Sequence, residues 1–125
     1  MPIERAHESL RASQLCLEAQ LVNSAASRAY FAMFQAAQVA PERAGVARGR
    51  WSHAAIQAAF TSELIHRRKV YPNALRRELS DGFGVRQAAD YSDPGVSQAA
   101  AHRIVRRASV FVSTVQEVSE RGRKG

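Results

Sequence analysis

The sequence has 125 residues, which is enough for one domain with a single hydrophobic core and too few for two. Hydrophobic residues make up 46% of the chain and charged residues 23%, a balance that excludes a largely disordered protein. The net charge is +7, from 18 Lys and Arg against 11 Asp and Glu. This excess favours an acidic partner such as nucleic acid or nucleotide phosphates, although a merely solvated basic surface would carry the same charge.

The cysteine, histidine and apolar content argues against disulfide bonds, metal sites, secretion and membrane insertion. Cys16 is the only cysteine, so neither an intrachain disulfide nor a cysteine zinc cluster can form. The four histidines show no metal-ligand spacing, and we expect no metal site and no cofactor. The start, MPIERAHESL, lacks the apolar run of a signal peptide, and no stretch approaches the ~18 apolar residues of a membrane span. We therefore expect a cytoplasmic protein without a membrane partner.

Two helices are predicted in the first 40 residues. An apolar stripe at helical spacing predicts a helix over about 2–21, and its members are Ile3, Leu10, Leu17 and Leu21. A second apolar face predicts a helix over about 24–40, formed by Ala26, Tyr30, Met33 and Ala37. Pro41 ends this helix, and residues 41–50, with two glycines and three arginines, are typical of an exposed loop.

Two more helices are predicted in the middle of the chain. Ser52 fits the N-cap of a helix over about 53–67, whose apolar face is Ile56, Phe60 and Leu64. Pro72 suits the first turn of a fourth helix, with an apolar face of Leu75, Leu79 and Phe83. Gly82 and Gly84 each cost this helix about 1 kcal/mol against alanine, so we expect a bend or break near Gly82.

The last helix has the most regular amphipathic pattern of the chain. Asp93 and Pro94 resemble an N-cap followed by proline at the first helical position. The apolar face then follows at alternating steps of three and four: Ala101, Ile104, Ala108, Phe111, Val115 and Val118. Residues 121–125 form a basic, frayed tail after a single domain over 1–120. The sequence therefore predicts an all-α, up-and-down bundle of four to five helices with no strands.

Three segments carry a family resemblance: NSAASRAYFAMFQAA at 23–37, WSHAAIQAAF at 51–60 and RQAADY at 86–91. Together they resemble the short HEPN proteins, whose pattern runs A-x-S-R-[AS]-Y-[YF]-A-M-F-x-A-A, then S-H, then R-x-x-[AS]-D-Y. The similarity covers about 10–118, and the first motif is the most specific. The resemblance implies a HEPN-like helical bundle.

Polar residues within these segments suggest one site. Arg28 lies among many apolar residues and needs a partner or the surface, because an unpaired buried charge is costly. Arg86 and Asp90 are four residues apart on one helix, close enough for an ion pair that extends to Arg28. Such a network either ties two helices together or binds a phosphate through Arg28 and Arg86, with Tyr91 at its rim.

The resemblance also implies a chemistry, which the sequence fits only in part. Many HEPN proteins are metal-independent ribonucleases with an R-x(4–6)-H motif, whose histidine acts as acid or base while the arginine holds the phosphate. Here Asp90 follows Arg86, and the next histidine is His102. Aspartate, with an ordinary pKa of about 3.9 against about 6.5 for histidine, would be a weak base and would repel phosphate. The catalytic candidates are therefore Arg86, Asp90 and His53, and whether the protein is an enzyme stays open.

His53 and Tyr91 each have a functional and a structural interpretation. His53 matches the Ser-His of the family pattern and can be brought near Arg86 by folding, or it can hydrogen-bond a helix start or loop. In related toxin–antitoxin pairs, a tyrosine after the R…H motif is nucleotidylated by a partner enzyme, and Tyr91 has a comparable position. Alternatively, Tyr91 packs on the bundle and hydrogen-bonds through its hydroxyl.

Basic residues gather in three clusters that could contact phosphates without sequence preference. These candidates for nucleic-acid binding are Arg67, Arg68, Lys69, Arg76, Arg77, Arg103, Arg106 and Arg107. No aromatic residues that could stack bases are interleaved with them. A solvated basic face explains the same clusters equally well.

Three functions are compatible with these observations. The first is a HEPN-type subunit of a prokaryotic toxin–antitoxin or defence module, a homodimer that binds RNA, a nucleotide or a partner such as a minimal nucleotidyltransferase. The second is a metal-independent endoribonuclease toxin in which His53 supplies the missing acid or base. The third is a non-catalytic structural subunit of a nucleoprotein complex.

Overall fold

A computed structural model describes residues 3–39, 51–66 and 74–124. The helices of this part of the chain are α1 (Ile3–Glu18), α2 (Val22–Ala37), α4 (His53–His66), α5 (Ala74–Tyr91) and α6 (Gln98–Lys124). No strand occurs among these residues, so the all-α prediction is confirmed. The predictions for Pro72 and for the loop over 41–50 concern residues outside the described ranges.

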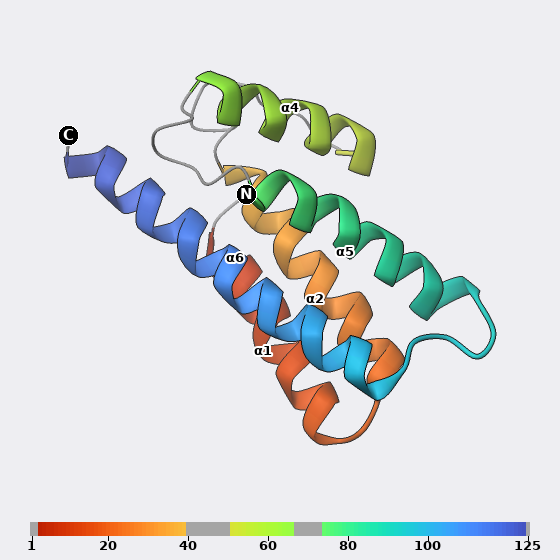
Figure 1. Ribbon diagram of the computed structural model, residues 1–125. Coiled ribbons are helices and arrows are strands. Elements are labelled where there is room, and N and C mark those ends of the chain that lie inside the picture. The colour runs from red at the N-terminus through yellow and green to blue at the C-terminus, as the bar shows by residue number, and fades with distance from the viewer. Residues whose placement is uncertain (1–2, 40–50, 67–73, 125) are drawn as a thin grey trace.

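Helix α2 is the centre of the bundle. It contacts α1, α5 and α6 along its length and α4 at its C-terminal end, while α4 lies across that end of the bundle beside α5 (Figure 1). Six alanines of α2 are fully buried: Ala25, Ala26, Ala29, Ala32, Ala36 and Ala37. Their small side chains let the neighbouring helices approach closely. The predicted apolar face is confirmed, because Tyr30 and Met33 are buried together with Ala26 and Ala37.

The end of α1 differs from the prediction. The helix ends at Glu18, because Gln20 adopts a positive φ of 64°. The Leu21 N–H donates to the Cys16 carbonyl at 2.8 Å, and the Gln20 N–H donates to the Leu17 carbonyl at 3.0 Å. This pair of bonds closes a Schellman motif, which leaves Leu21 55% exposed instead of in the apolar stripe.

The predicted start of α4 is confirmed. The Ala55 N–H donates to Ser52 Oγ at 3.1 Å, as an N-cap requires. Ile56 and Phe60 are both fully buried, and the Phe60 ring packs against the Phe111 ring of α6 at 5.6 Å between centroids. The side chain of Leu64 lies outside the described residues.

The bend predicted at Gly82 is wrong, because α5 continues unbroken from Ala74 to Tyr91. A Cβ at Gly82 would lie 3.2 Å from Met33 Sδ and 3.4 Å from Ile104 Cδ1. Glycine at this position therefore favours the tight packing of α5 against Met33 and Ile104, and it causes no change of direction. A Cβ at Gly84 would meet nothing within 4 Å.

The predicted start of α6 is also wrong. Ser97, not Asp93, is the N-cap, since the Ala100 N–H donates to Ser97 Oγ at 3.1 Å. Gly95, with a φ of 88°, keeps the preceding residues in a turn, and the Val96 N–H donates to Asn23 Oδ1 at 2.9 Å. This contact attaches the turn to the start of α2.

The rest of α6 follows the predicted pattern. All six residues of its predicted apolar face are buried: Ala101, Ile104, Ala108, Phe111, Val115 and Val118. The helical backbone extends to Lys124, so residues 121–124 continue α6 where the sequence suggested a frayed tail.

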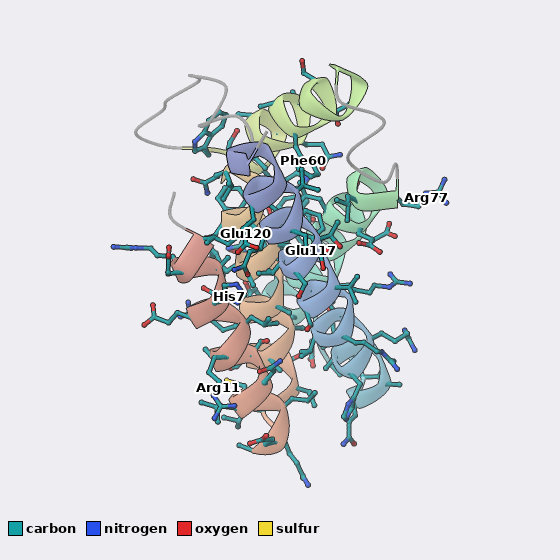
Figure 2. The ribbon with its side chains drawn as sticks, turned by 90° about the vertical axis from the view of Figure 1, so that its left-hand side faces the viewer. His7, Arg11, Phe60, Arg77, Glu117 and Glu120 are labelled. Carbon is teal, nitrogen blue, oxygen red and sulfur yellow. The ribbon has the colours of Figure 1, made fainter. Side chains whose placement is uncertain are left out.

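Polar side chains also join α1 to its neighbours (Figure 2). His7 faces α6, where its Nε2 lies 2.5 Å from Gln116 Oε1, and Gln116 Nε2 donates to Glu120 at 3.1 Å. Ser9 donates to Gln35 Oε1 of α2 at 2.7 Å. His7 is therefore part of a helix–helix contact.

No helix in the described ranges is both long and apolar enough to cross a bilayer.

Candidate ligand-binding site

A cavity of about 330 Å3 lies between α2, the start of α4 and α5. Aromatic side chains dominate its walls, with a hydroxyl, an imidazole and a guanidinium among them. The lining residues are Tyr30, Phe31, Phe34, Trp51, Ser52, His53, Phe83 and Arg86. We call this space the aromatic cavity.

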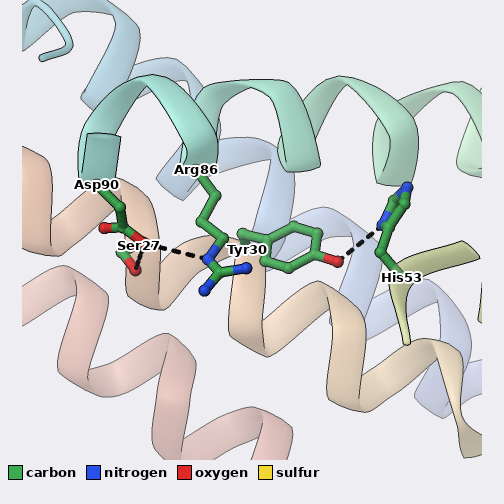
Figure 3. A network of polar contacts seen from close by, with 5 residues as sticks. All are labelled: Ser27, Tyr30, His53, Arg86 and Asp90. Atoms are coloured by element: carbon green, nitrogen blue, oxygen red, sulfur yellow. Dashed lines mark hydrogen bonds and ion pairs between the residues drawn. The ribbon is translucent and has the colours of Figure 1, made fainter. Parts of the chain in front are cut away.

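Tyr30 and His53 form one side of the aromatic cavity (Figure 3). The Tyr30 hydroxyl lies 2.8 Å from His53 Nδ1, and the His53 ring stacks on Phe83 at 3.9 Å with 10° between the planes. Burial raises the pKa of Tyr30, although the positive charge of Arg86 opposes the shift. Burial likewise lowers the pKa of His53 from its ordinary value of 6.5. Both side chains are therefore uncharged at neutral pH.

Arg86 forms the charged side of the aromatic cavity. Its Nε donates to Asp90 Oδ2 at 3.1 Å, and Ser27 Oγ donates to the same oxygen at 3.4 Å (Figure 3). The guanidinium lies 5.2 Å from the ring centre of Phe31 and 5.9 Å from that of Tyr30. Asp90 thus fixes one edge of the guanidinium. Within the described part of the chain, its terminal nitrogens have no hydrogen-bond partner and can bind an anion.

The structure unites some of the predicted site residues and separates others. Arg86 and Asp90 form the expected ion pair, and His53 lies in the same cavity as Arg86. Arg28 does not join the expected network, because Asp90 is bonded to Arg86 and to Ser27. Ser27 faces α5, and the next residue is turned by about 100° on the helix. Arg28 is consequently exposed, with its guanidinium 5.7 Å from the Phe31 ring centre.

Tyr91 lies apart from the cavity, at the end of α5. Its side chain is 76% exposed, so the structural interpretation, in which it packs on the bundle, is wrong. The chain turns immediately after it: Ser92 ends the helix with its hydroxyl on the Ala88 carbonyl at 2.8 Å. The phenol is accessible to another protein.

The basic candidates lie elsewhere on the surface. Arg103, Arg106 and Arg107 are exposed along α6, and Arg107 lies 3.9 Å from Asp81 of α5. Arg77 projects from the N-terminal part of α5 (Figure 2). The remaining candidates have side chains outside the described residues: Arg67, Arg68, Lys69 and Arg76.

Most of the cavity wall was missed at the sequence level. The apolar spacing predicts Tyr30, Phe34 and Phe83 as core residues and gives no role to Phe31 or Trp51. The signal lay in the YFxxF run of α2, since three aromatics within five residues cover more than one face of a helix. An aromatic residue outside the buried face indicates a second contact surface.

The cavity combines three chemical capacities. A held guanidinium binds phosphate oxygens. A neutral imidazole can accept or donate a proton. Aromatic walls can stack on a planar ligand. No group of three or more His, Cys, Asp or Glu that could hold a metal ion occurs within 3–39, 51–66 and 74–124.

The model of the HEPN domain family matches residues 2–118, nearly the entire chain. The match includes α1, α2, α4 and α5, α6 as far as Val118, and the residues that line the aromatic cavity. It confirms the resemblance that the three sequence segments indicated. No curated protein matches the sequence.

Proposed function

This chain belongs to the HEPN domain family, and on that basis we propose that it is the RNA- or nucleotide-binding subunit of a prokaryotic toxin–antitoxin or defence module. At the level of the family, membership supports a role related to RNA or nucleotides, or a toxin-like role. The observation that carries the finer proposal is Arg86, whose guanidinium is fixed by Asp90 at the edge of a cavity. A pre-oriented guanidinium with free N–H groups is suited to a phosphate.

Asp90 favours binding over cleavage. The carboxylate accepts hydrogen bonds from Arg86 and Ser27, so its position is that of an orienting group. A carboxylate in this position neutralises part of the arginine charge and is already engaged by two donors. The pair therefore supports a site that holds a phosphate without breaking its ester bond.

The test is RNA binding measured by fluorescence anisotropy at low salt. We expect Arg86→Ala to weaken binding by roughly 10- to 100-fold, the value of a hydrogen bond to a charged group. Arg11→Ala is the matched control, since Arg11 is an exposed arginine of α1 outside the site (Figure 2). Equal losses in the two variants, or no binding by the wild type, would contradict the proposal.

A second candidate function is a metal-independent endoribonuclease. It is favoured by one observation: His53, neutral at pH 7, lines the same cavity as Arg86. His53 would then act as the acid or base and Arg86 would stabilise the phosphate. Purified protein with a labelled RNA pool in EDTA tests this role. Cleavage that is lost in both His53→Gln and Arg86→Ala would support the nuclease. If the RNA stays intact, the RNA-binding subunit remains the proposed function.

The proposal includes two protein partners. Tyr91 is exposed and directly follows Asp90, which supports a role as acceptor for a minimal nucleotidyltransferase. Its phenol oxygen would displace pyrophosphate from the α-phosphate of a nucleoside triphosphate and lose its proton. Mass spectrometry of the protein from its native host should find a nucleotide on the Tyr91 peptide, and none in Tyr91→Phe.

The second partner is another copy of the chain, as is usual for such proteins. Sedimentation should give twice the monomer mass. If instead the protein has no affinity for RNA and binds a neighbouring gene product tightly, the structural-subunit alternative holds.

A further inference from the structure

We infer that the aromatic cavity takes a single unstacked nucleobase of single-stranded RNA, with the adjoining phosphate on Arg86. This inference rests on the proposed function, since it assigns the other half of the ligand that Arg86 would bind. It gives a role to the aromatic walls, which phosphate binding alone does not need.

The size and walls of the cavity fit a base. Its volume of about 330 Å3 is near the lower end of small-molecule sites, which span roughly 300–1,000 Å3. It therefore suits one planar group and is too small for two nucleotides. The rings are set at angles to each other, with Tyr30 5.8 Å from Phe34 and 5.7 Å from Phe83 between centroids. Phe31, Phe34 and Trp51 line the cavity and are half-buried.

Polar groups in the wall distinguish a base from a purely apolar ligand. Ser52 Oγ accepts the Ala55 N–H and keeps its own proton to donate. His53 is neutral and its Nδ1 is taken by the Tyr30 hydroxyl, so Nε2 is the ring nitrogen left to bind a ligand. A hydrocarbon could bind neither the Ser52 hydroxyl proton, nor His53 Nε2, nor the terminal nitrogens of Arg86, whereas the edge of a base and its phosphate can. Stacking on aromatic side chains tolerates any base, because every base has a π face.

Two arginines at one ring favour a base within a strand over a free base. The guanidinium groups of Arg86 and Arg28 lie 5.2 Å and 5.7 Å from the centre of Phe31. A base that took the place of one guanidinium at Phe31 would have two cations nearby for the phosphates of its nucleoside. A nucleotide within a strand carries two such phosphates, whereas a nucleoside monophosphate carries one. Arg28 thereby gains a role that its position outside the Arg86–Asp90 pair does not otherwise explain.

The experiment uses Trp51, which is the only tryptophan of the chain and lines the cavity. Its fluorescence is titrated with AMP, ribose 5-phosphate, inorganic phosphate, oligo(A) and duplex RNA. We expect saturable quenching by AMP, at least tenfold weaker binding of ribose 5-phosphate, and the tightest binding by oligo(A). Duplex RNA should leave the fluorescence unchanged, because its bases are paired.

The outcomes separate the base site from the proposed function. If ribose 5-phosphate binds as tightly as AMP, or if RNA binds without any change at Trp51, the base site is wrong and the phosphate site stands. If AMP quenches the fluorescence but oligo(A) binds no more tightly than AMP, the site takes free nucleotides, and the assignment of its ligand to single-stranded RNA is wrong. If no ligand binds, both proposals fail.

Variants test the wall itself. Phe31→Leu should weaken AMP and oligo(A) binding about tenfold, and Phe31→Tyr should restore it, because only an aromatic face is required. Leu15→Ala, an exposed apolar position on α1, is the control and should leave binding unchanged. Unchanged binding in a folded Phe31→Leu protein would overturn the inference. Should that variant fail to fold, the comparison of AMP with ribose 5-phosphate in the wild type decides.

Discussion

The hydrogen bond between Tyr30 and His53 joins the hydrophobic core to the candidate site. The phenol is 2% exposed, and its only hydrogen-bond partner among the described residues is the imidazole. Because burial keeps the phenol protonated, it can donate to Nδ1, which leaves the proton of the neutral ring on Nε2. The core thereby sets both the orientation and the protonation of His53.

Removing the Tyr30 hydroxyl should therefore reduce the free energy of unfolding only slightly. Tyr30→Phe keeps the ring in the core and breaks one hydrogen bond, so we expect a loss of about 1 kcal/mol in the free energy of unfolding. Tyr30→Ala would also leave a cavity and should cost roughly 3–5 kcal/mol. Urea denaturation measures both. Equal losses in the two variants would show that the ring contributes nothing beyond its hydroxyl.

The lowered pKa of His53 predicts a pH dependence of stability. The unfolded chain protonates His53 near its ordinary pKa of 6.5, and the folded protein only at lower pH. Between the two values the unfolded state binds more protons, so stability falls as the pH decreases below about 6.5. The urea midpoint of the wild type should decline across this interval. His53→Gln should flatten the decline, whereas His102→Gln, at an exposed position on α6, should not.

At the scale of elements, α5 carries the charged part of the candidate site. Phe83, Arg86 and Asp90 lie on successive turns and face α2, so the packing of one helix places all three. Gly82 lies one residue before Phe83 on α5, where an added Cβ would meet Met33 of α2 and Ile104 of α6. The glycine therefore allows tight packing of α5 next to the cavity wall.

Replacing each of the two glycines of α5 by alanine should have different effects on the stability of the protein. Gly84→Ala meets open space and should stabilise the protein by about 0.5–1 kcal/mol through helix propensity. Gly82→Ala has the same propensity gain, but its methyl group would lie 3.2 Å from Met33 Sδ and should cancel or reverse the gain. Thermal unfolding of the pair measures the difference. A similar gain in both variants would mean that Met33 moves freely aside.

The sequence predicted the helices well because amphipathic spacing and capping are local. The N-cap Ser52 and the buried face of α6 are both confirmed. The errors at Gly82 and at the start of α6 arose where a distant contact decides the local structure. Asn23 holds the turn at Val96 from 73 residues away. The side chain of Met33 occupies the space beside Gly82 and accounts for a glycine at that position. Neither partner can be read from the residues around the turn or the glycine.

At the scale of the whole molecule, two different surfaces could meet RNA. The aromatic cavity is lined by α2, α4 and α5, together with the two residues before α4, while Arg103, Arg106 and Arg107 line the outer side of α6. The Arg86–Asp90 pair was predictable, since both partners lie on one helix. The aromatic wall was not, because it assembles from three segments whose packing only the tertiary structure shows.

Salt dependence should separate these two surfaces. Replacing Arg103, Arg106 and Arg107 together by alanine should reduce the slope of log K against log salt by about 2, if each contacts one phosphate of a single strand. Arg86→Ala should lower affinity at every salt concentration and change the slope by less than 1. Anisotropy titrations between low and physiological salt measure both. If the slope of log K against log salt is unchanged in the triple variant, the three arginines of α6 form a solvated surface that does not contact RNA.

The close contact of Gly82 with Met33 has a consequence for how this protein could change its ligand during evolution. A larger side chain at position 82 would push α5 outward and carry Phe83 and Arg86 with it. The aperture between α2 and α5 would widen although no residue of the wall had changed. Selectivity for ligand size can therefore be adjusted from behind the wall, at a position that no ligand touches.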